Sequence, residues 1–367
     1  MKWPVINENR DQDVVINQQV RMNATSNDYL GMANNQALKQ CIADAIMTYG
    51  VGSTGSRRLS GNHQIFLDTE QYIANWVGKP AGVLFNSGFQ MNSSIFSVLA
   101  SKSTLIVADK LIHASLIDGI QNSDAQLVRF RHNDMDHLAQ VLKKYAHNYS
   151  EVIIVCESIY SMDGDTAPIN DMIQLKNEYN AMLIVDEAHS IGLYGNGGSG
   201  WINEQGCLSD VDIVLVTFGK AFGLSGAMLL SSQDIVAKMR AKCRSYIYST
   251  ALPLSIAVGI QKSCDLIQES DELRQRLSQN INAFKSIIQS NSDTQIQPII
   301  IGENNDASRC EQALIDAGYF VRAVHHPTVP KGQSRLRITI TAQHSVDQIS
   351  ELAQQINNVM MPSRVIG

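Results

Sequence analysis

The sequence predicts an α/β protein: a large domain whose mostly parallel sheet lies between helices, followed by a smaller C-terminal α+β domain. Short apolar, β-rich runs alternate with amphipathic helical stretches between residues 81 and 232, which is the pattern of a parallel sheet covered by helices. The pattern changes after Pro253, and the 367 residues are enough to bury two cores. We expect an N-terminal segment at 1–40, a large domain at 41–252, and a linking helix with the small domain at 253–367.

Seven apolar runs are the expected strands of the large domain. In chain order they are AGVLF (81–85), TLIVAD (104–109), QLVRF (126–130), EVIIVCE (151–157), AMLIVDEA (181–188), DIVLVTF (212–218) and AMLLSS (227–232). The stretches between them have helical periodicity, as in 134–146, where apolar side chains recur at i, i+3, i+4 and i+7 behind a capping aspartate. The residues that carry this pattern are Asp134, Leu138, Val141, Leu142 and Tyr145.

The small domain is expected to begin with a long helix that runs from Pro253 to about Ile288. After it come a strand in QIQPIIIG, a helix around SRCEQALIDAGY, further extended runs in FVRAVHH and SRLRITITA, and a terminal helix. The apolar face of that last helix is formed by Ile349, Leu352, Ile356 and Val359.

Composition narrows the range of partners. A formal net charge of -6 argues against a nucleic-acid or anionic-membrane surface, and no stretch approaches the 18 apolar residues of a membrane span. The six cysteines form no C-x-x-C pair and no Cys/His cluster at metal-ligand spacing, so we expect reduced thiols and no metal site. The N-terminal residues lack the character of a signal or transit peptide, which favours a cytoplasmic protein.

Polar side chains follow five of the predicted strands at the point where each strand ends. In parallel sheets these ends meet at one edge, where ligands bind. The residues are Asn86, Ser87, Gly88 and Phe89; Asp109 and His113; Ser161 and Asp163; Asp186, Glu187 and His189; Thr217 and Lys220.

Asp186 and Lys220 are the pair that pyridoxal 5'-phosphate (PLP) requires. A lysine forms a Schiff base with this cofactor, and an aspartate keeps its pyridine nitrogen protonated. A salt bridge at the sheet edge is the alternative for the two residues alone. The context favours PLP, because Lys220 lies in the glycine-containing segment VTFGKAFGLSGA, where Thr217 offers a hydroxyl to a phosphate. A nucleotide-binding P-loop is excluded, since Ala221 stands where that motif has Ser or Thr.

Other candidate features have two interpretations each. Gly88 and Phe89 open a helix whose N-terminal amides could hold an anion, or they form a plain strand-to-helix turn. The loop GVGSTGSRRLSG (50–61) is either a flexible surface loop or runs close to a ligand or a second subunit. Arg335 and Arg337 share one face of a strand, where an arginine could bind a carboxylate or belong to a surface ladder.

With these residues in view, the sequence from about Ser26 onward resembles the α-oxoamine synthase family of fold-type I PLP-dependent transferases. The matching segments are SNDYLG, GVGSTGSRRLSGN, FNSGF, DKLIHASL, SMDGD, VDEAHSIGLYG, VTFGKAFGLSGA, YSTALP and RLRITIT. The resemblance implies PLP as cofactor and a homodimer with shared active sites, in which the loop 50–61 serves the neighbouring subunit's site.

The resemblance also assigns roles to single residues. It implies that Lys220 forms the Schiff base, Asp186 pairs with the pyridinium, His189 contacts the ring hydroxyl and His113 stacks on the ring, with Lys220, His113 and Asp186 as catalytic residues. The further cofactor-binding residues that it implies are Gly88, Phe89, Ser161, Thr217 and Tyr248. The substrate-binding residues that it implies are Arg337 for the amino-acid carboxylate, Thr328 and Asn27.

Within this family the similarity is greatest to the branch that acts in biotin biosynthesis. It rests on RFRHND, IYST, IQPIIIG and HPTVPKGQSRLRITIT, and on Phe218 in the lysine motif. It implies a decarboxylative condensation of L-alanine with pimeloyl-CoA or pimeloyl-acyl carrier protein. The alternatives are the same chemistry on another substrate pair, such as glycine with acetyl-CoA, ordinary transamination, and a silent subunit, against which the intact Lys220 motif weighs.

Overall fold

The computed structural model describes residues 4–10 and 12–364, with side chains as far as Met360, and its contacts divide the chain into two units. Unit 1 consists of Met1–Asn34, Ser161–Asp165 and Ser270–Gly367, and unit 2 of Asn35–Tyr160 and Thr166–Glu269. The domain boundaries expected from the sequence, at residues 40 and 252, stay a prediction.

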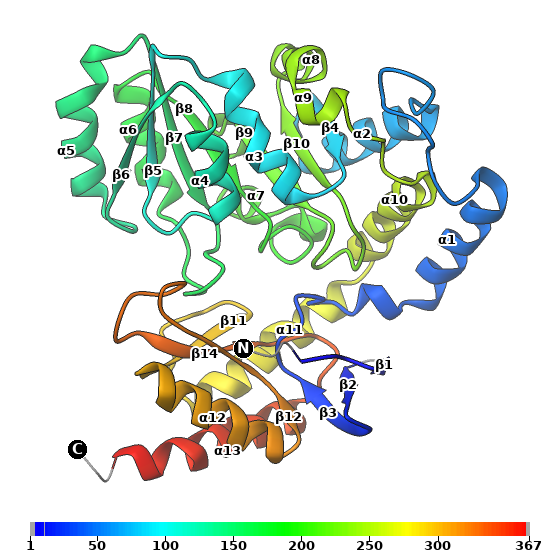
Figure 1. Ribbon diagram of the computed structural model, residues 1–367, viewed down its shortest axis with the longest axis vertical. Coiled ribbons are helices and arrows are strands. Elements are labelled where there is room, and N and C mark those ends of the chain that lie inside the picture. Colours follow the sequence, from blue (N-terminus) through cyan, green and yellow to red (C-terminus); the bar gives the residue numbers. More distant parts are fainter. Residues whose placement is uncertain (1–3, 11, 365–367) are drawn as a thin grey trace. The chain divides into compact units, whose positions relative to one another are not determined.

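Unit 2 is built on a seven-stranded sheet with the strand order β4-β10-β9-β8-β7-β5-β6 (Figure 1). The strands are β4 (Ala81–Phe85), β5 (Thr104–Asp109), β6 (Gln126–Phe130), β7 (Glu151–Glu157), β8 (Met182–Asp186), β9 (Ile213–Thr217) and β10 (Ala227–Ser231). The series from β9 to β6 is parallel, whereas β10 is antiparallel to both of its neighbours. The predicted mostly parallel sheet is therefore confirmed. The reversal at β10 follows from a β9–β10 connection without a helix, because a parallel return needs a long crossover.

Helices cover this sheet because its strands are apolar on both faces. On one face, side chains of the central strands pack in one cluster with apolar residues of α3 (Gly88–Leu99), α4 (Ala114–Gln121) and α8 (Gln233–Lys242). The remaining α-helices of the unit are α1 (Gln36–Tyr49), α2 (Gln64–Val77), α5 (Met135–Tyr145), α6 (Ile169–Glu178), α7 (Trp201–Glu204), α9 (Arg244–Ile247) and α10 (Leu254–Gln268).

Two helices show where sequence patterns succeed and fail. Helix α5 begins behind Asp134, whose carboxylate accepts a hydrogen bond from the His137 amide at 2.8 Å, as the capping pattern predicts. The single long helix expected after Pro253 is wrong, because the chain breaks at Ser270 between α10 and α11 (Asp271–Ile287). Acidic residues in the first turn of α11 stabilise its N-terminus, so a second helix can begin there.

The described part of unit 1 contains two small sheets, three α-helices and a short 3-10 helix at Met32–Asn34. One sheet has the order β11-β14-β13, formed by β11 (Ile296–Gly302), β14 (Ser334–Thr339) and β13 (Arg322–Val324). The other has the order β1-β2-β3-β12, formed by β1 (Glu8–Arg10), β2 (Asp13–Ile16), β3 (Gln19–Asn23) and β12 (Tyr319–Phe320). The α-helices are α11, α12 (Asn304–Asp316) and α13 (Val346–Arg364).

The segment Ser161–Asp165 belongs to unit 1 and is held there by hydrogen bonds from a buried arginine to partly exposed acceptors. Arg335 is 1% exposed and donates to Asp163 Oδ1 at 2.6 Å and to the Met162 carbonyl at 3.2 Å. Gly164 has φ 68°, and a Cβ at this position would lie 2.1 Å from the Ile296 carbonyl oxygen. Only glycine therefore fits this turn, and the ion pair fixes the segment beside β14.

Replacing Asp163 by alanine should destabilise the protein, because it leaves the guanidinium of Arg335 buried without its carboxylate. We expect a loss of about 3 kcal/mol in the free energy of unfolding, measured as a fall of several degrees in the thermal midpoint. The matched control is Asp306→Ala, which removes the partner of the exposed Arg309 and should change the midpoint little. Equal midpoints for the two variants would contradict the buried role of the Asp163–Arg335 pair.

Among the described residues, none of the helices combines the length and apolar character that crossing a bilayer requires.

Candidate active site

Lys220 lies directly after β9, in the short connection to β10. The turn is closed by hydrogen bonds from the Gly223 amide to the Lys220 carbonyl and from the Leu224 amide to the Phe218 carbonyl, each at 2.8 Å. Gly223 has φ 68°, which favours glycine there. The half-buried Lys220 side chain places its Nζ 2.9 Å from His189 Nε2. The structure thus brings together the two residues that the strand-end pattern had only placed on neighbouring strands.

Asp186 ends β8, and its carboxylate is 4% exposed. Oδ2 accepts a hydrogen bond from Asn92 Nδ2 at 3.0 Å, and Oδ1 accepts one from the Ala188 amide at 3.0 Å. These two hydrogen bonds hold the carboxylate in one orientation and satisfy both of its oxygens in a site with little water. Asn92, on α3, was not among the predicted site residues, because nothing in its sequence position indicates that α3 turns it toward β8.

His113 caps the N-terminus of α4 and faces the same group of residues. The Ser115 amide donates to His113 Nδ1 at 3.2 Å, so the neutral ring carries its proton on Nε2. Desolvation lowers the pKa of His113; the negative charge of Asp186 opposes this shift and the positive charge of Lys220 adds to it. The ring is therefore neutral near pH 7, and both charged groups lie close enough to act on it.

Gly88 and Thr217 meet where β9 ends and α3 begins. A Cβ added to Gly88 would lie 2.7 Å from Thr217 Cγ2, so the close approach of the two segments needs glycine. Among the described residues, Thr217 Oγ1 is buried without a hydrogen-bond partner. Phe89, the next residue of α3, is 54% exposed. A buried hydroxyl without a partner beside a helix N-terminus can serve an anion.

Within unit 1, three further predicted residues lie together. The Arg337 guanidinium donates from Nε to the Ser161 carbonyl at 2.7 Å, from Nη1 to Thr339 Oγ1 at 2.9 Å and from Nη2 to Asn27 Oδ1 at 3.2 Å. Burial raises the pKa of the nearby Tyr29 hydroxyl, against the attraction of Arg337. These three hydrogen bonds hold Arg337 in one orientation. Arg335 on the same strand is buried, so the two arginines do not form an exposed surface ladder.

Two predicted residues are not part of these groups. Tyr248 follows α9 and is 72% exposed, with the guanidinium of Arg244 5.1 Å from its ring centre. Thr328 is exposed in the turn between β13 and β14, and no described hydrogen bond joins it to Arg337. The structure therefore leaves the roles of Tyr248 and Thr328 as predictions.

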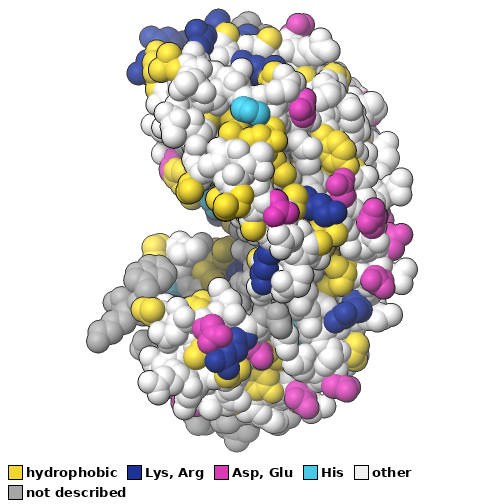
Figure 2. All heavy atoms as spheres, turned by 90° about the vertical axis from the view of Figure 1, so that its right-hand side faces the viewer, with side chains coloured by type: hydrophobic (Ala, Val, Ile, Leu, Met, Phe, Trp, Pro, Cys, Tyr) yellow, Lys and Arg dark blue, Asp and Glu magenta, His cyan; other side chains and the backbone are white. Residues whose placement is uncertain are grey.

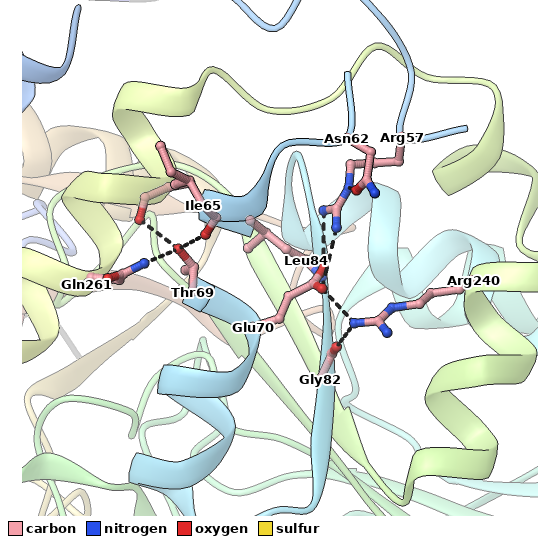
Figure 3. A network of polar contacts seen from close by, with 10 residues as sticks. Arg57, Asn62, Ile65, Thr69, Glu70, Gly82, Leu84, Arg240 and Gln261 are labelled. Atoms are coloured by element: carbon pink, nitrogen blue, oxygen red, sulfur yellow. Dashed lines mark hydrogen bonds and ion pairs between the residues drawn. The ribbon is translucent and has the colours of Figure 1, made fainter. Parts of the chain in front are cut away.

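The loop 50–61 is tied to the rest of unit 2 by a buried carboxylate. Glu70 on α2, 2% exposed, pairs with Arg57 of the loop at 3.1 Å and with Arg240 of α8 at 2.6 Å (Figure 3). Its Oε1 also accepts a hydrogen bond from the Leu84 amide at 2.9 Å. The Ala251 amide donates to the Gly55 carbonyl at 2.9 Å. These contacts give the loop a fixed course, which disfavours the interpretation as a flexible surface loop.

No metal site accompanies these groups in the part of the chain that the structure describes, where no cluster of three or more His, Cys, Asp or Glu is placed to hold an ion.

Comparison with known proteins agrees with this geometry. The model of the aminotransferase class I and II family matches residues 20–356. A Bacillus cereus protein provisionally named 8-amino-7-oxononanoate synthase is 38% identical over 362 residues, which cover 96% of this chain and 91% of the relative.

Two solved structures show the same fold. Serine palmitoyltransferase from S. paucimobilis, bound to a PLP–myriocin aldimine, superimposes with a TM-score of 0.95 at 28% identity and covers 99% of this chain and 93% of its own. The 8-amino-7-oxononanoate synthase from Francisella tularensis superimposes with a TM-score of 0.82 at 29% identity, covering 94% of this chain and 99% of its own. The chain therefore belongs to the aminotransferase class I and II family and, within it, to the α-oxoamine synthases, PLP-dependent enzymes of fold type I.

Proposed function

We propose that the protein is an 8-amino-7-oxononanoate synthase, which condenses L-alanine with a pimeloyl thioester and releases carbon dioxide and the free thiol. The contact between Lys220 Nζ and His189 Nε2, beside a carboxylate fixed at Asp186, carries the assignment to PLP chemistry. The substrate pair is supported by the name of the Bacillus cereus relative and by the sequence segments of the biotin branch.

The residues of unit 2 fit PLP as a resident cofactor. Thr217 Oγ1, buried without a partner, would donate to the phosphate, and Gly88 leaves room beside it. Asp186 would hold the pyridine nitrogen, and His189, next to Lys220 Nζ, would contact the ring hydroxyl. PLP, when bound, supplies the electron sink that lets a bond at the amino-acid α-carbon break.

The side chains of this chain would supply the proton transfers. Lys220 Nζ would remove the proton from the α-carbon of alanine and later return one. His113, neutral and protonated on Nε2, would stack on the cofactor ring and donate to the thioester carbonyl oxygen as negative charge develops there. Phe89, Ser161 and Tyr248 would complete the cofactor contacts.

Arg337 would bind the carboxylate of the amino acid. Its guanidinium is already oriented by Ser161, Thr339 and Asn27, so little side-chain freedom is lost when the substrate binds. A guanidinium can hold a carboxylate by two parallel hydrogen bonds, which fixes the α-carbon relative to the protein. Asn27 and Thr328 would add contacts to the substrate.

We further propose that two copies of the chain form a homodimer. Figure 2 shows the side of the molecule that carries α1 and α2, where hydrophobic side chains gather on the surface of unit 2. Large apolar side chains are highly exposed on α1 and the following loop: Met47 at 86%, Val51 at 80% and Leu59 at 79%. Apolar surface of this kind usually marks an interface. The same loop, with Tyr248, would reach the neighbouring subunit's site.

A second candidate is another α-oxoamine synthase that uses a different pair of substrates. The TM-score of 0.95 to a serine palmitoyltransferase exceeds the 0.82 to the Francisella tularensis enzyme, and both share less than a third of their residues with this chain. The fold accommodates either reaction, so the substrate must be decided by assay.

The purified enzyme should release carbon dioxide from L-alanine when pimeloyl-CoA or pimeloyl-acyl carrier protein is supplied, and more slowly or not at all from glycine or serine. Turnover is measured as carbon dioxide and free thiol for each amino acid with pimeloyl-, acetyl- and palmitoyl-CoA. Lys220→Ala is the control without turnover, because it lacks the amine that bonds PLP. Preference for serine with palmitoyl-CoA, or glycine with acetyl-CoA, would replace the proposed substrates.

Thr217→Val should weaken PLP binding without destabilising the cofactor-free protein, because the hydroxyl that it removes has no partner to lose. A hydrogen bond to a charged phosphate contributes about 1.5–3 kcal/mol, so we expect the Kd for PLP to rise roughly tenfold or more. Binding is followed by absorbance and stability by the thermal midpoint. Thr217→Ser keeps the hydroxyl and should bind PLP like the wild type. Unchanged affinity in Thr217→Val would argue against a phosphate contact.

The double variant Met47→Glu and Leu59→Glu should be monomeric, since charges at these positions oppose burial of the proposed interface. Sedimentation should give a mass of about twice the 40.4 kDa of one chain for the wild type, and the mass of one chain for the variant. The control Ile300→Glu changes an apolar residue that is 49% exposed on β11 and should remain dimeric. A monomeric wild type, or a variant that still dimerises, would contradict the proposed surface.

A further inference from the structure

Glu157 is a buried carboxyl group at the centre of the candidate site to which the proposed reaction gives no role. It ends β7, as Asp186 ends β8, and the two residues are paired in the parallel register of these strands. Glu157 is 3% exposed and Asp186 is 4% exposed. Two carboxyl groups therefore lie side by side at one edge of the sheet, with little access to water.

The hydrogen bonds of the two carboxyl groups differ. Asp186 accepts from Asn92 on one oxygen and from the Ala188 amide on the other. The Oε1 of Glu157, by contrast, is buried without a partner among the described residues. A carboxylate needs donors at both oxygens when it is buried, so the charge is better accommodated on Asp186.

Burial and the nearby carboxylates raise the pKa of Glu157 more than the nearby cation lowers it. Burial, followed by repulsion from Asp186, raises the pKa of Glu157 to about 8, against the attraction of Lys220. Asp109 at the end of β5 also raises it. On its own chain segment, the thiol of Cys156 and the hydroxyl of Tyr160 have raised pKa values and stay neutral. Lys220 is thus the cation that faces Glu157 among these groups.

We propose that Glu157 remains uncharged beside Asp186, so that Asp186 carries the single negative charge offered to the cofactor. Two adjacent carboxylates cannot both ionise cheaply in a site without water. The neutral acid avoids that repulsion while it fills the position beside Asp186. The inference rests on the proposed placement of Asp186 against the pyridine nitrogen of PLP, and it adds how the neighbouring carboxyl group leaves that charge single.

The charge state can be tested on the cofactor-free protein. The infrared spectrum at pH 7 should contain a carbonyl band of a protonated carboxylic acid that Glu157→Gln removes. Glu151, exposed at the other end of the same strand, provides the matched control, and Glu151→Gln should leave that band unchanged. If Glu157→Gln removes no such band, Glu157 is ionised and the proposal is wrong. This result does not depend on which substrates the enzyme uses.

The pH dependence of stability gives a second measurement on the same variants. A folded pKa raised above the ordinary value means that the contribution of Glu157 is full below about 4.5 and is lost as pH rises toward about 8. Glu157→Gln cannot lose a proton, so its thermal midpoint should fall less than that of the wild type over this range. Parallel pH profiles of the two proteins would overturn the proposal.

Whether turnover needs a charge at Glu157 is tested by comparing two substitutions in the PLP-bound enzyme. Glu157→Gln keeps an uncharged group of the same size beside Asp186, and we expect its kcat and Kd for PLP within about threefold of the wild type, whereas Glu157→Ala leaves a cavity there and should lose at least tenfold in kcat. A glutamine variant as impaired as the alanine variant would show that the charge is needed. An alanine variant with unchanged kcat would show that the site does not depend on the group beside Asp186. If the wild type does not turn over alanine, the proposed substrate is wrong, and the infrared result still decides the charge state.

Discussion

The negative charge of Asp186 is the constraint around which unit 2 is arranged. A buried carboxylate is tolerated only where donors surround it, and Asn92 from α3 and the Ala188 amide supply them. The parallel register then places Glu157 beside it, and the connection after β9 brings Lys220 to His189. The apolar strands beneath these residues exclude water and make each of these interactions stronger.

The hydrogen bonds of unit 1 hold the guanidinium of Arg337 in an orientation in which it can bind an anion. Arg337 keeps its orientation because Ser161, Asn27 and Thr339 accept its hydrogen bonds. Ser161 in turn lies in a segment that Arg335 fixes through Asp163. The two arginines of β14 thus have separate roles. The buried Arg335 fixes the segment Ser161–Asp165, and the half-buried Arg337 donates to the Ser161 carbonyl of that segment.

The sequence was most informative where burial and periodicity agree. The seven strands of unit 2 and the cap of α5 follow from apolar runs and from Asp134. The hairpin β2–β3 escaped notice because its turn uses Asn17 and Gln18 at positive φ, without the glycine that usually marks such a turn. Asn92 and the Gly88–Thr217 contact could not be predicted either, because they depend on how α3 packs against the strands.

The antiparallel strand β10 has a consequence for motion. The connection that carries Lys220 has both ends in hydrogen-bonded strands inside the sheet, since β9 lies between β8 and β10, and β10 lies between β9 and β4. At the two ends of this connection the Phe218 amide donates to the Gly226 carbonyl and the Leu224 amide to the Phe218 carbonyl. Hydrogen bonds of core strands open only with the most protected part of a fold. These two amides should therefore exchange with solvent about as slowly as those of the core, so the ends of the segment that carries the lysine keep their place through local fluctuations.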